Sequence, residues 1–148
     1  MKIAIGADHA GYHLKQDILE YIRYLGYDCD DFGTHSADAV DYPDIAVSVA
    51  RAVAAGKYDR GILICGTGVG MGITANKVRG IRAAVCNDTF TAHETRAHND
   101  ANVLCMGGRV IGSGLARDIV KTWLETQFSQ GERHTRRVGK MTALDEQR

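Results

Sequence analysis

The chain has 148 residues, 45% of them hydrophobic and 24% charged, and its 18 basic and 18 acidic side chains leave no formal net charge at pH 7. This size and composition predict a single soluble domain over residues 1–148, without linkers or repeats. The balanced charge argues against nucleic acid or an anionic membrane as the main partner. No apolar run approaches the roughly 18 residues that a membrane span needs.

Strand and helix patterns alternate along the chain. Apolar runs predict strands over residues 2–5, 27–32, 62–65, 81–86 and 102–106. Apolar residues at helical spacing predict five helices. They cover residues 14–25, Pro43 to about 53, the end of the glycine loop to 78, 89–98, and the segment around Leu115, Ile119 and Trp123. Five alternations predict a three-layer α/β fold of the Rossmann or flavodoxin-like kind, with a parallel sheet of order 2-1-3-4-5 and helices on both faces.

The four cysteines are scattered and contain no Cys-x-x-Cys pair. Three of them fall in or near expected strands, where cysteine is usually a small buried hydrophobe. This pattern favours a reducing, cytoplasmic location and argues against a structural zinc site. The first residues, Met1–Gly6, have the pattern of a strand and lack the plan of a signal peptide.

The stretch Arg60–Ala75, RGILICGTGVGMGITA, has the layout of an anion site. A buried strand leads into alternating glycines and then into a helix, so backbone N–H groups can approach a ligand closely. The P-loop is excluded because no Gly-Lys-Ser/Thr follows, and the dinucleotide fingerprint is excluded because its third glycine is missing. A tight turn without a ligand is the plain alternative.

Cys65 has two interpretations. It can be the last buried position of a strand, or a thiol activated beside helix N–H groups. Its neighbours favour reactivity, because Thr67 can hydrogen-bond nearby and the loop N–H groups can hold a developing oxyanion.

Other polar residues are expected near the carboxyl ends of strands one and three, where ligands bind in such sheets. Asp8 and His9 follow strand one, and Tyr42 can reach the same rim. His98 and Asn99 end a helix that we expect to open onto this rim as well, although a histidine at a helix end is more often solvated. Three arginines without matching carboxylates suit a phosphate group, and they are Arg109, Arg133 and Arg137.

The sequence resembles the type B ribose-5-phosphate isomerases, in the family that also holds galactose-6-phosphate isomerase subunits. The resemblance covers nearly the whole chain. It is carried by GADHAGYHLK at 6–15, DYPD at 41–44, LICGTGVGMGITANKVRGIRAA at 63–84, RAHNDANVLCMGGRVIG at 96–112 and RHTRR at 133–137.

The resemblance implies a role for each matching residue. It implies an aldose–ketose isomerase of the non-oxidative pentose phosphate pathway that acts through a cis-enediolate, without metal or cofactor. Cys65 matches the base, Thr67 and the loop match the enediolate-stabilising part, and His98 matches the ring-opening group. The sugar and phosphate contacts match Asp8, His9, Tyr42, Gly66, Thr67, Gly68, Val69, Gly70, Asn99, Arg109, Arg133 and Arg137.

Two alternatives stay open on the sequence alone. One is an isomerase of a six-carbon sugar phosphate, allose or galactose 6-phosphate, and the other is a nucleotide- or phosphate-binding module without turnover.

The tail 133–148 carries an apolar stripe at Val138, Met141 and Leu144, although no further strand is left for a helix there to connect or cover. We expect it to form a helix that docks on the partner subunit of a homodimer, with active sites at the interface. Such dimers can pair further into a dimer of dimers.

Overall fold

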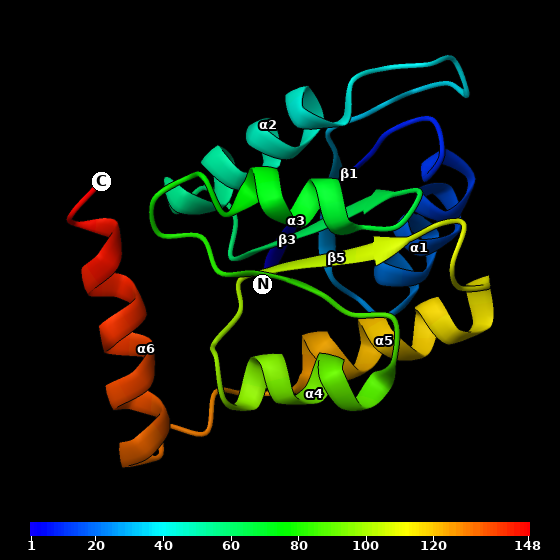
Figure 1. Cartoon of the computed structure of the whole chain (residues 1–148). Coiled ribbons are helices and arrows are strands. Elements are labelled where there is room, and N and C mark those ends of the chain that lie inside the picture. Colours follow the sequence, from blue (N-terminus) through cyan, green and yellow to red (C-terminus); the bar gives the residue numbers. More distant parts are fainter.

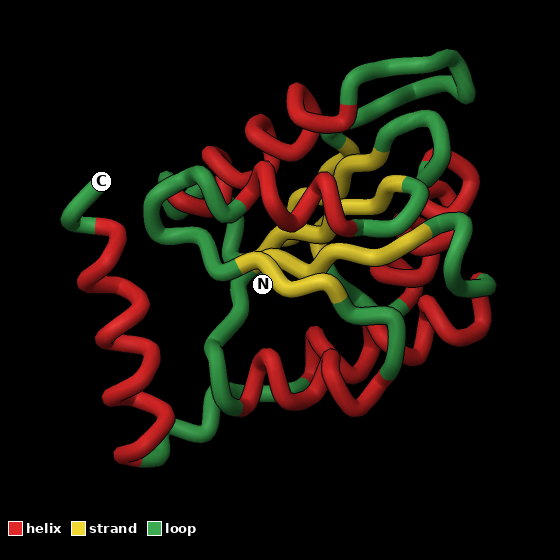
Figure 2. Tube along the Cα trace, in the orientation of Figure 1, coloured by secondary structure: helices red, strands yellow, loops and turns green.

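A parallel five-stranded sheet forms the middle layer of the protein (Figures 1 and 2). The computed structural model describes all 148 residues. The elements are β1 (Lys2–Ala7), α1 (Tyr12–Tyr24), β2 (Asp28–Asp31), α2 (Tyr42–Ala54), β3 (Arg60–Cys65), α3 (Val69–Ala75), β4 (Ala83–Val85), α4 (Thr89–Ala97), β5 (Val103–Gly107), α5 (Ser113–Glu125) and α6 (Glu132–Asp145). None of its helices combines the length and the apolar content that a membrane span requires.

The predicted α/β class with a parallel sheet is confirmed, but the predicted strand order was wrong. The strands lie in the order β2-β1-β3-β5-β4, so β5 occupies the position expected for β4. β5 pairs with β3 from Gly61↔Val103 to Cys65↔Gly107. All five residues of β5 are buried, whereas the three residues of β4 are only partly buried. The more apolar strand therefore takes the central position and the shorter one takes the edge.

Helices cover both faces of the sheet. α2 and α3 pack on one face around Val49, Leu63 and Met71, and α1, α4 and α5 pack on the other around Ile18, Ile62 and Trp123 (Figure 1). Alternate residues of β3 thus point into opposite cores, which explains the continuous apolar run Ile62–Ile64.

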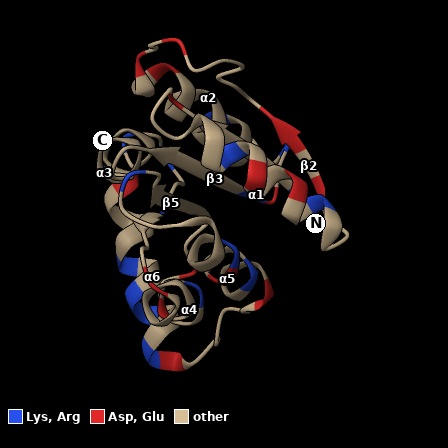
Figure 3. Ribbon diagram, turned by 90° about the vertical axis from the view of Figure 1, so that its right-hand side faces the viewer, with Lys and Arg blue, Asp and Glu red and all other residues tan.

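Both sheet edges are occupied by polar groups. At the β4 edge the amide of Asn76 donates to the carbonyl of Ala83 at 2.9 Å and accepts its N–H at 2.8 Å, as a neighbouring strand would. At the β2 edge the strand is mostly aspartate (Figure 3). There Asp30 accepts a hydrogen bond from Tyr58 Oη at 2.7 Å.

Helix α1 carries a lysine that is completely buried. The Nζ atom of Lys15 lies 2.6 and 2.7 Å from the two carboxylate oxygens of Asp31 and 2.6 Å from the carbonyl of Thr34. All three N–H bonds of the ammonium group are therefore satisfied, and this ion pair ties α1 to the loop after β2.

Helix α6 stands apart from the layers and contains no buried residue (Figure 1). Its C-terminal end is fixed by Asp145, whose Oδ2 accepts the N–H of Gly80 at 2.8 Å and whose carbonyl accepts from Arg79 Nε at 2.6 Å. Just before the helix, Ser129 donates its N–H to the carbonyl of Ala97 at 3.0 Å. The predicted C-terminal helix exists, and Met141 and Leu144 of its apolar stripe remain exposed in a single chain.

Candidate active site

The loops after β1, β3 and β5 form one connected rim at the carboxyl edge of the sheet. The N–H of Asp8 bonds to the carbonyl of Ile64 at 3.2 Å, and the N–H groups of Gly108 and Arg109 bond to the carbonyls of Cys65 and Gly66 at 2.8 and 3.0 Å. These backbone bonds fix the relative positions of three loops that carry predicted site residues. The swap of β4 and β5 brings the β5 loop, with Arg109, next to the Cys65 loop.

Cys65 is the last residue of β3, and its sulfur faces the glycine loop. The Sγ atom accepts the N–H of Gly68 at 3.1 Å, and the residue is 5% exposed. Gly68 has φ +82°, and a Cβ there would lie 2.9 Å from the backbone carbon of Met106, so only glycine fits. The sulfur therefore lies against a backbone donor of the glycine loop.

The other three thiols lack this arrangement. Burial raises the pKa of Cys29 to about 12 and that of Cys86 to about 11, and it also raises the pKa of Cys105. These residues act as small hydrophobes in the core, as their sequence context predicts.

The glycine loop offers unbonded backbone donors beside Cys65. The N–H groups of Gly66, Thr67 and Gly70 bond to no acceptor in the protein. The exposed Thr67 side chain accepts the N–H of Val69 at 3.2 Å, which shapes the turn into α3. Three free donors on one short loop can stabilise a negatively charged oxygen next to the thiol.

Asp8 and His9 follow β1, next to the end of β3, and Tyr42 contacts the start of α3. Asp8 Oδ1 accepts the N–H groups of Ala10 and Gly11, and His9 Nδ1 accepts the N–H of Val40 at 3.3 Å. The ring of Tyr42 covers the start of α3, where a Cβ at Gly70 would lie 2.7 Å from it.

The prediction that His98 and Asn99 share the Cys65 rim was wrong for a single chain. Helix α4 returns from the carboxyl end of β4 to the start of β5, so its C-cap His98 lies at the amino edge of the sheet. Helix α6, which carries Arg133 and Arg137, lies on that side of the sheet too (Figure 1), whereas Arg109 follows β5 at the carboxyl edge. The candidate residues thus form two groups at opposite ends of the strands.

The amino-edge group is centred on two stacked imidazoles. The rings of His98 and His134 have centroids 4.1 Å apart and are tilted by 34°. His98 Nδ1 lies 2.8 Å from Glu94 Oε2, and His134 Nδ1 lies 2.7 Å from Ser129 Oγ. Desolvation, the His98 ring and the positive charges of the nearby α6 arginines lower the pKa of His134. Basic residues line the exposed side of α6 (Figure 3).

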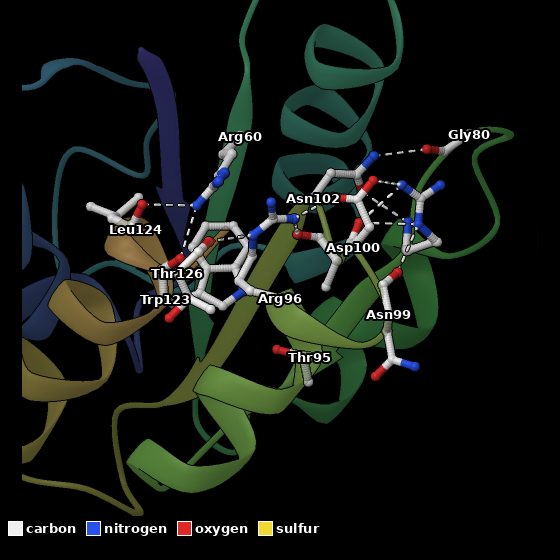
Figure 4. Close-up of polar contacts among 12 residues, drawn as sticks. Arg60, Gly80, Thr95, Arg96, Asn99, Asp100, Asn102, Trp123, Leu124 and Thr126 are labelled. Carbon is white, nitrogen blue, oxygen red and sulfur yellow. Dashed lines mark hydrogen bonds and ion pairs between the residues drawn. The ribbon is translucent and has the colours of Figure 1, made fainter. Parts of the chain in front are cut away.

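An arginine clamp holds the loop that follows His98 (Figure 4). Asp100 has φ +48°, and its carboxylate binds Arg96 Nη1 at 2.8 Å and Arg82 Nη2 at 3.1 Å. Arg82 Nε also donates to the carbonyl of Asn99 at 3.1 Å. The exposed side-chain amide of Asn99 bonds to nothing in the protein and is free for a ligand. The backbone of this loop is therefore held in place by the clamp, while the side chain of Asn99 stays exposed.

No cavity of the single chain includes Cys65. A cavity of about 320 Å³ lies between α6 and the β4 edge, and its lining includes Asn99 and Met141. No group of three His, Cys, Asp or Glu side chains is placed to hold a metal ion.

Sequence reasoning missed two contributors to the amino-edge group. The first is Glu94, whose i,i+4 spacing from His98 on a helix was a usable signal. The second is the clamp of Arg82, Arg96 and Asp100. The i,i+4 spacing of Arg96 and Asp100 was a usable signal too, but no local pattern indicated Arg82, which lies 18 residues from Asp100.

Comparison with known proteins matches residues 3–141 to the family described as Ribose/Galactose Isomerase. Ribose-5-phosphate isomerase B of Escherichia coli is 50% identical over 147 residues, which cover 99% of this chain and 98% of that protein. D-erythrulose-4-phosphate isomerase of Pectobacterium atrosepticum is 46% identical over 132 residues, which cover 88% of this chain and 87% of that protein.

Solved structures agree. Ribose-5-phosphate isomerase B of Clostridium thermocellum superposes with a TM-score of 0.97 at 54% identity, over 99% of both chains. The enzyme of the same name from Mycoplasma genitalium, solved with bound ribulose-5-phosphate, has a TM-score of 0.95 at 40% identity, over 99% of this chain and 97% of that one.

Proposed function

Because the chain belongs to the ribose/galactose isomerase family and is a sugar-phosphate isomerase, we propose that it interconverts ribose 5-phosphate and ribulose 5-phosphate. One observation carries the proposal: the Cys65 sulfur accepts the Gly68 N–H at the end of β3, beside three unbonded N–H groups. A base next to an oxyanion site is what an aldose–ketose isomerisation requires.

Cys65 acts as the base in this mechanism. The thiolate removes the proton from C2 of the open-chain aldose, and the electrons of that C–H bond form the cis-enediolate while O1 becomes negatively charged. The N–H groups of Gly66, Thr67 and Gly70 stabilise this charge. The proton of the C2 hydroxyl passes to O1, and the electrons of that O–H bond form the carbonyl at C2. The electrons of the C=C bond meanwhile take the proton from the thiol at C1, which yields the ketose with no net change in oxidation state.

We further propose that each active site is completed by a second chain. Cys65 and His98 lie at opposite ends of strands, and β3 alone spans about 17 Å at ~3.3 Å per residue. A five-carbon sugar phosphate cannot bridge that separation within one chain. A twofold dimer places the amino-edge group of one chain over the carboxyl-edge rim of the other. His98 and Asn99 then act on the sugar ring, and Arg133 and Arg137 bind the phosphate together with Arg109.

The shape of α6 supports this arrangement. A 14-residue helix without a buried residue gains little stability from its own domain, and isolated helices of that length are marginal in water. Docking on a partner buries Met141 and Leu144 and delivers the two arginines at the same time.

The test of the chemistry is Cys65→Ala. This variant should retain its fold and lose about 10²–10⁴ in kcat, the usual contribution of a positioned base. Normal turnover in a folded Cys65→Ala protein would refute the assignment. His98→Asn should slow turnover of ribose 5-phosphate, while solvent deuterium should still enter C1 of ribulose 5-phosphate, because that exchange needs no ring opening.

The substrate itself is tested by comparing kcat/KM for ribose 5-phosphate, allose 6-phosphate, galactose 6-phosphate and D-erythrulose 4-phosphate. The four-carbon compound is included because the Pectobacterium relative bears its name. We expect the highest value for ribose 5-phosphate. A higher value for any of the others would replace it as the substrate.

A further inference from the structure

Glu94 on α4 lies between two histidines. Its Oε1 is 2.8 Å from Nδ1 of His93, and its Oε2 is 2.8 Å from Nδ1 of His98. The Glu94 side chain is 28% exposed, while those of the two histidines are 53% and 42% exposed. The carboxylate is therefore directed at His98 from a partly covered position.

This contact determines which nitrogen of His98 can face a substrate. This contact is a close ion-pair approach at 2.8 Å, and because a carboxylate cannot donate, it favours the tautomer with the proton on Nδ1. In the neutral imidazole the lone pair is then on Nε2. His134 covers one face of the same ring at a centroid distance of 4.1 Å. The ring thus meets Glu94 at Nδ1 and His134 on one face, while no hydrogen bond or ion pair of the protein occupies Nε2.

We propose that Glu94 is the positioning residue of His98, holding the imidazole in the tautomer and orientation that present Nε2 to the furanose ring. The inference rests on the proposed ring-opening role of His98. Carboxylate partners orient functional histidines in this way in hydrolase triads and metal sites.

In ring opening, His98 acts first as a base and then as an acid. Nε2 takes the proton of the anomeric hydroxyl, and the electrons of that O–H bond form the carbonyl at C1. The bond between C1 and the ring oxygen breaks with its electron pair on that oxygen, which takes a proton from water. The imidazolium, still paired with Glu94 at Nδ1, then returns the proton on Nε2 to the hydroxide.

An ordinary helix-stabilising pair is the competing explanation, and the chain contains a matched example. Lys121 and Glu125 on α5 form an exposed i,i+4 pair at 2.7 Å. Pairs of this kind contribute little to stability. Glu125→Leu therefore serves as the control for loss of a paired carboxylate from a helix.

The first measurement is the tautomer of His98, read from ¹H–¹⁵N NMR correlations of its two ring nitrogens at pH above 8. His98→Asn identifies its signals among the six histidines. We expect a proton on Nδ1 in the native protein and in Glu125→Leu, and loss of that preference in Glu94→Leu. A native His98 with its proton on Nε2, or an unchanged preference in Glu94→Leu, would overturn the inference.

The second measurement separates ring opening from proton transfer. Glu94→Leu should lower kcat for ribose 5-phosphate about 10- to 100-fold, the usual cost of losing a partner that orients a histidine. Deuterium entry at C1 of ribulose 5-phosphate should stay near the native rate. If His98→Asn loses turnover but Glu94→Leu does not, only the inference about Glu94 fails, and the ring-opening role of His98 stands. If His98→Asn keeps full turnover, the ring-opening role itself fails.

Discussion

A shared active site can be detected by mixing two inactive variants. The first is Cys65→Ala, which lacks the base at the carboxyl edge. The second is Arg133→Ala with Arg137→Ala, which lacks the phosphate-binding pair on α6. The two defects lie at opposite ends of the sheet, so a twofold dimer separates them into different halves of each site.

The expected recovery follows from the geometry. Equal amounts refolded together pair at random, so half of the dimers contain one chain of each kind. In such a dimer one site carries both defects and the other carries none. A quarter of all sites should therefore be intact, and activity per chain should reach about one quarter of the native value.

Two controls make the result decisive. A chain carrying all three substitutions, mixed with Cys65→Ala, should recover nothing, because every site then lacks the base. Arg136→Ala removes a charge from the same exposed helix and should stay active on its own. If mass-tagged mixed dimers form and no activity returns, the arginines act within their own chain and the shared site is refuted.

Three further predictions concern stability and reactivity. Lys15→Met should lower the free energy of unfolding by about 3 kcal/mol, the low end for a broken buried ion pair, because Asp31 keeps one backbone N–H bond; a change below 1 kcal/mol in urea unfolding would contradict this. Gly70→Ala should impair turnover because its Cβ would lie 2.7 Å from the Tyr42 ring, and the added substitution Tyr42→Ala should relieve that contact; a wild-type rate for Gly70→Ala alone would count against it. Iodoacetamide at pH 8 should label Cys65 first, since burial raises the pKa of the other three thiols and keeps them protonated below about pH 10; faster labelling of any of them by peptide mass mapping would be inconsistent.

The carboxyl-edge site was predictable because its signals are local. The run Ile62–Ile64, the alternating glycines and Cys65 lie within one strand–loop–helix unit, and the structure places them as the pattern indicates. Strand order was harder to predict, because the hydrophobic periodicity of a strand does not identify the strands with which it pairs. The signal was nevertheless present: β4 follows Arg82 and contains two alanines, whereas β5 is wholly apolar until its final glycine, as a central strand should be.

The misplacement of His98 has a topological cause. In a parallel sheet each connecting helix runs back to the amino edge, so a residue that ends such a helix cannot share the rim of a residue that ends a strand. That rule alone separates His98 from Cys65. No single-chain pattern contains the surface on which α6 is proposed to dock, because an exposed apolar stripe does not specify the position of its partner.

The polar groups at the two sheet edges determine how copies of this chain can associate. Strand addition is an open-ended process, since each added sheet presents a new edge to the next molecule. The Asn76 amide already fills the hydrogen-bonding positions of Ala83, and the aspartates of β2 repel another acidic strand. Association through helices and loops is the remaining route, and a twofold contact of that kind closes at two copies. The chain can therefore expose apolar residues for assembly without exposing a template for fibre growth.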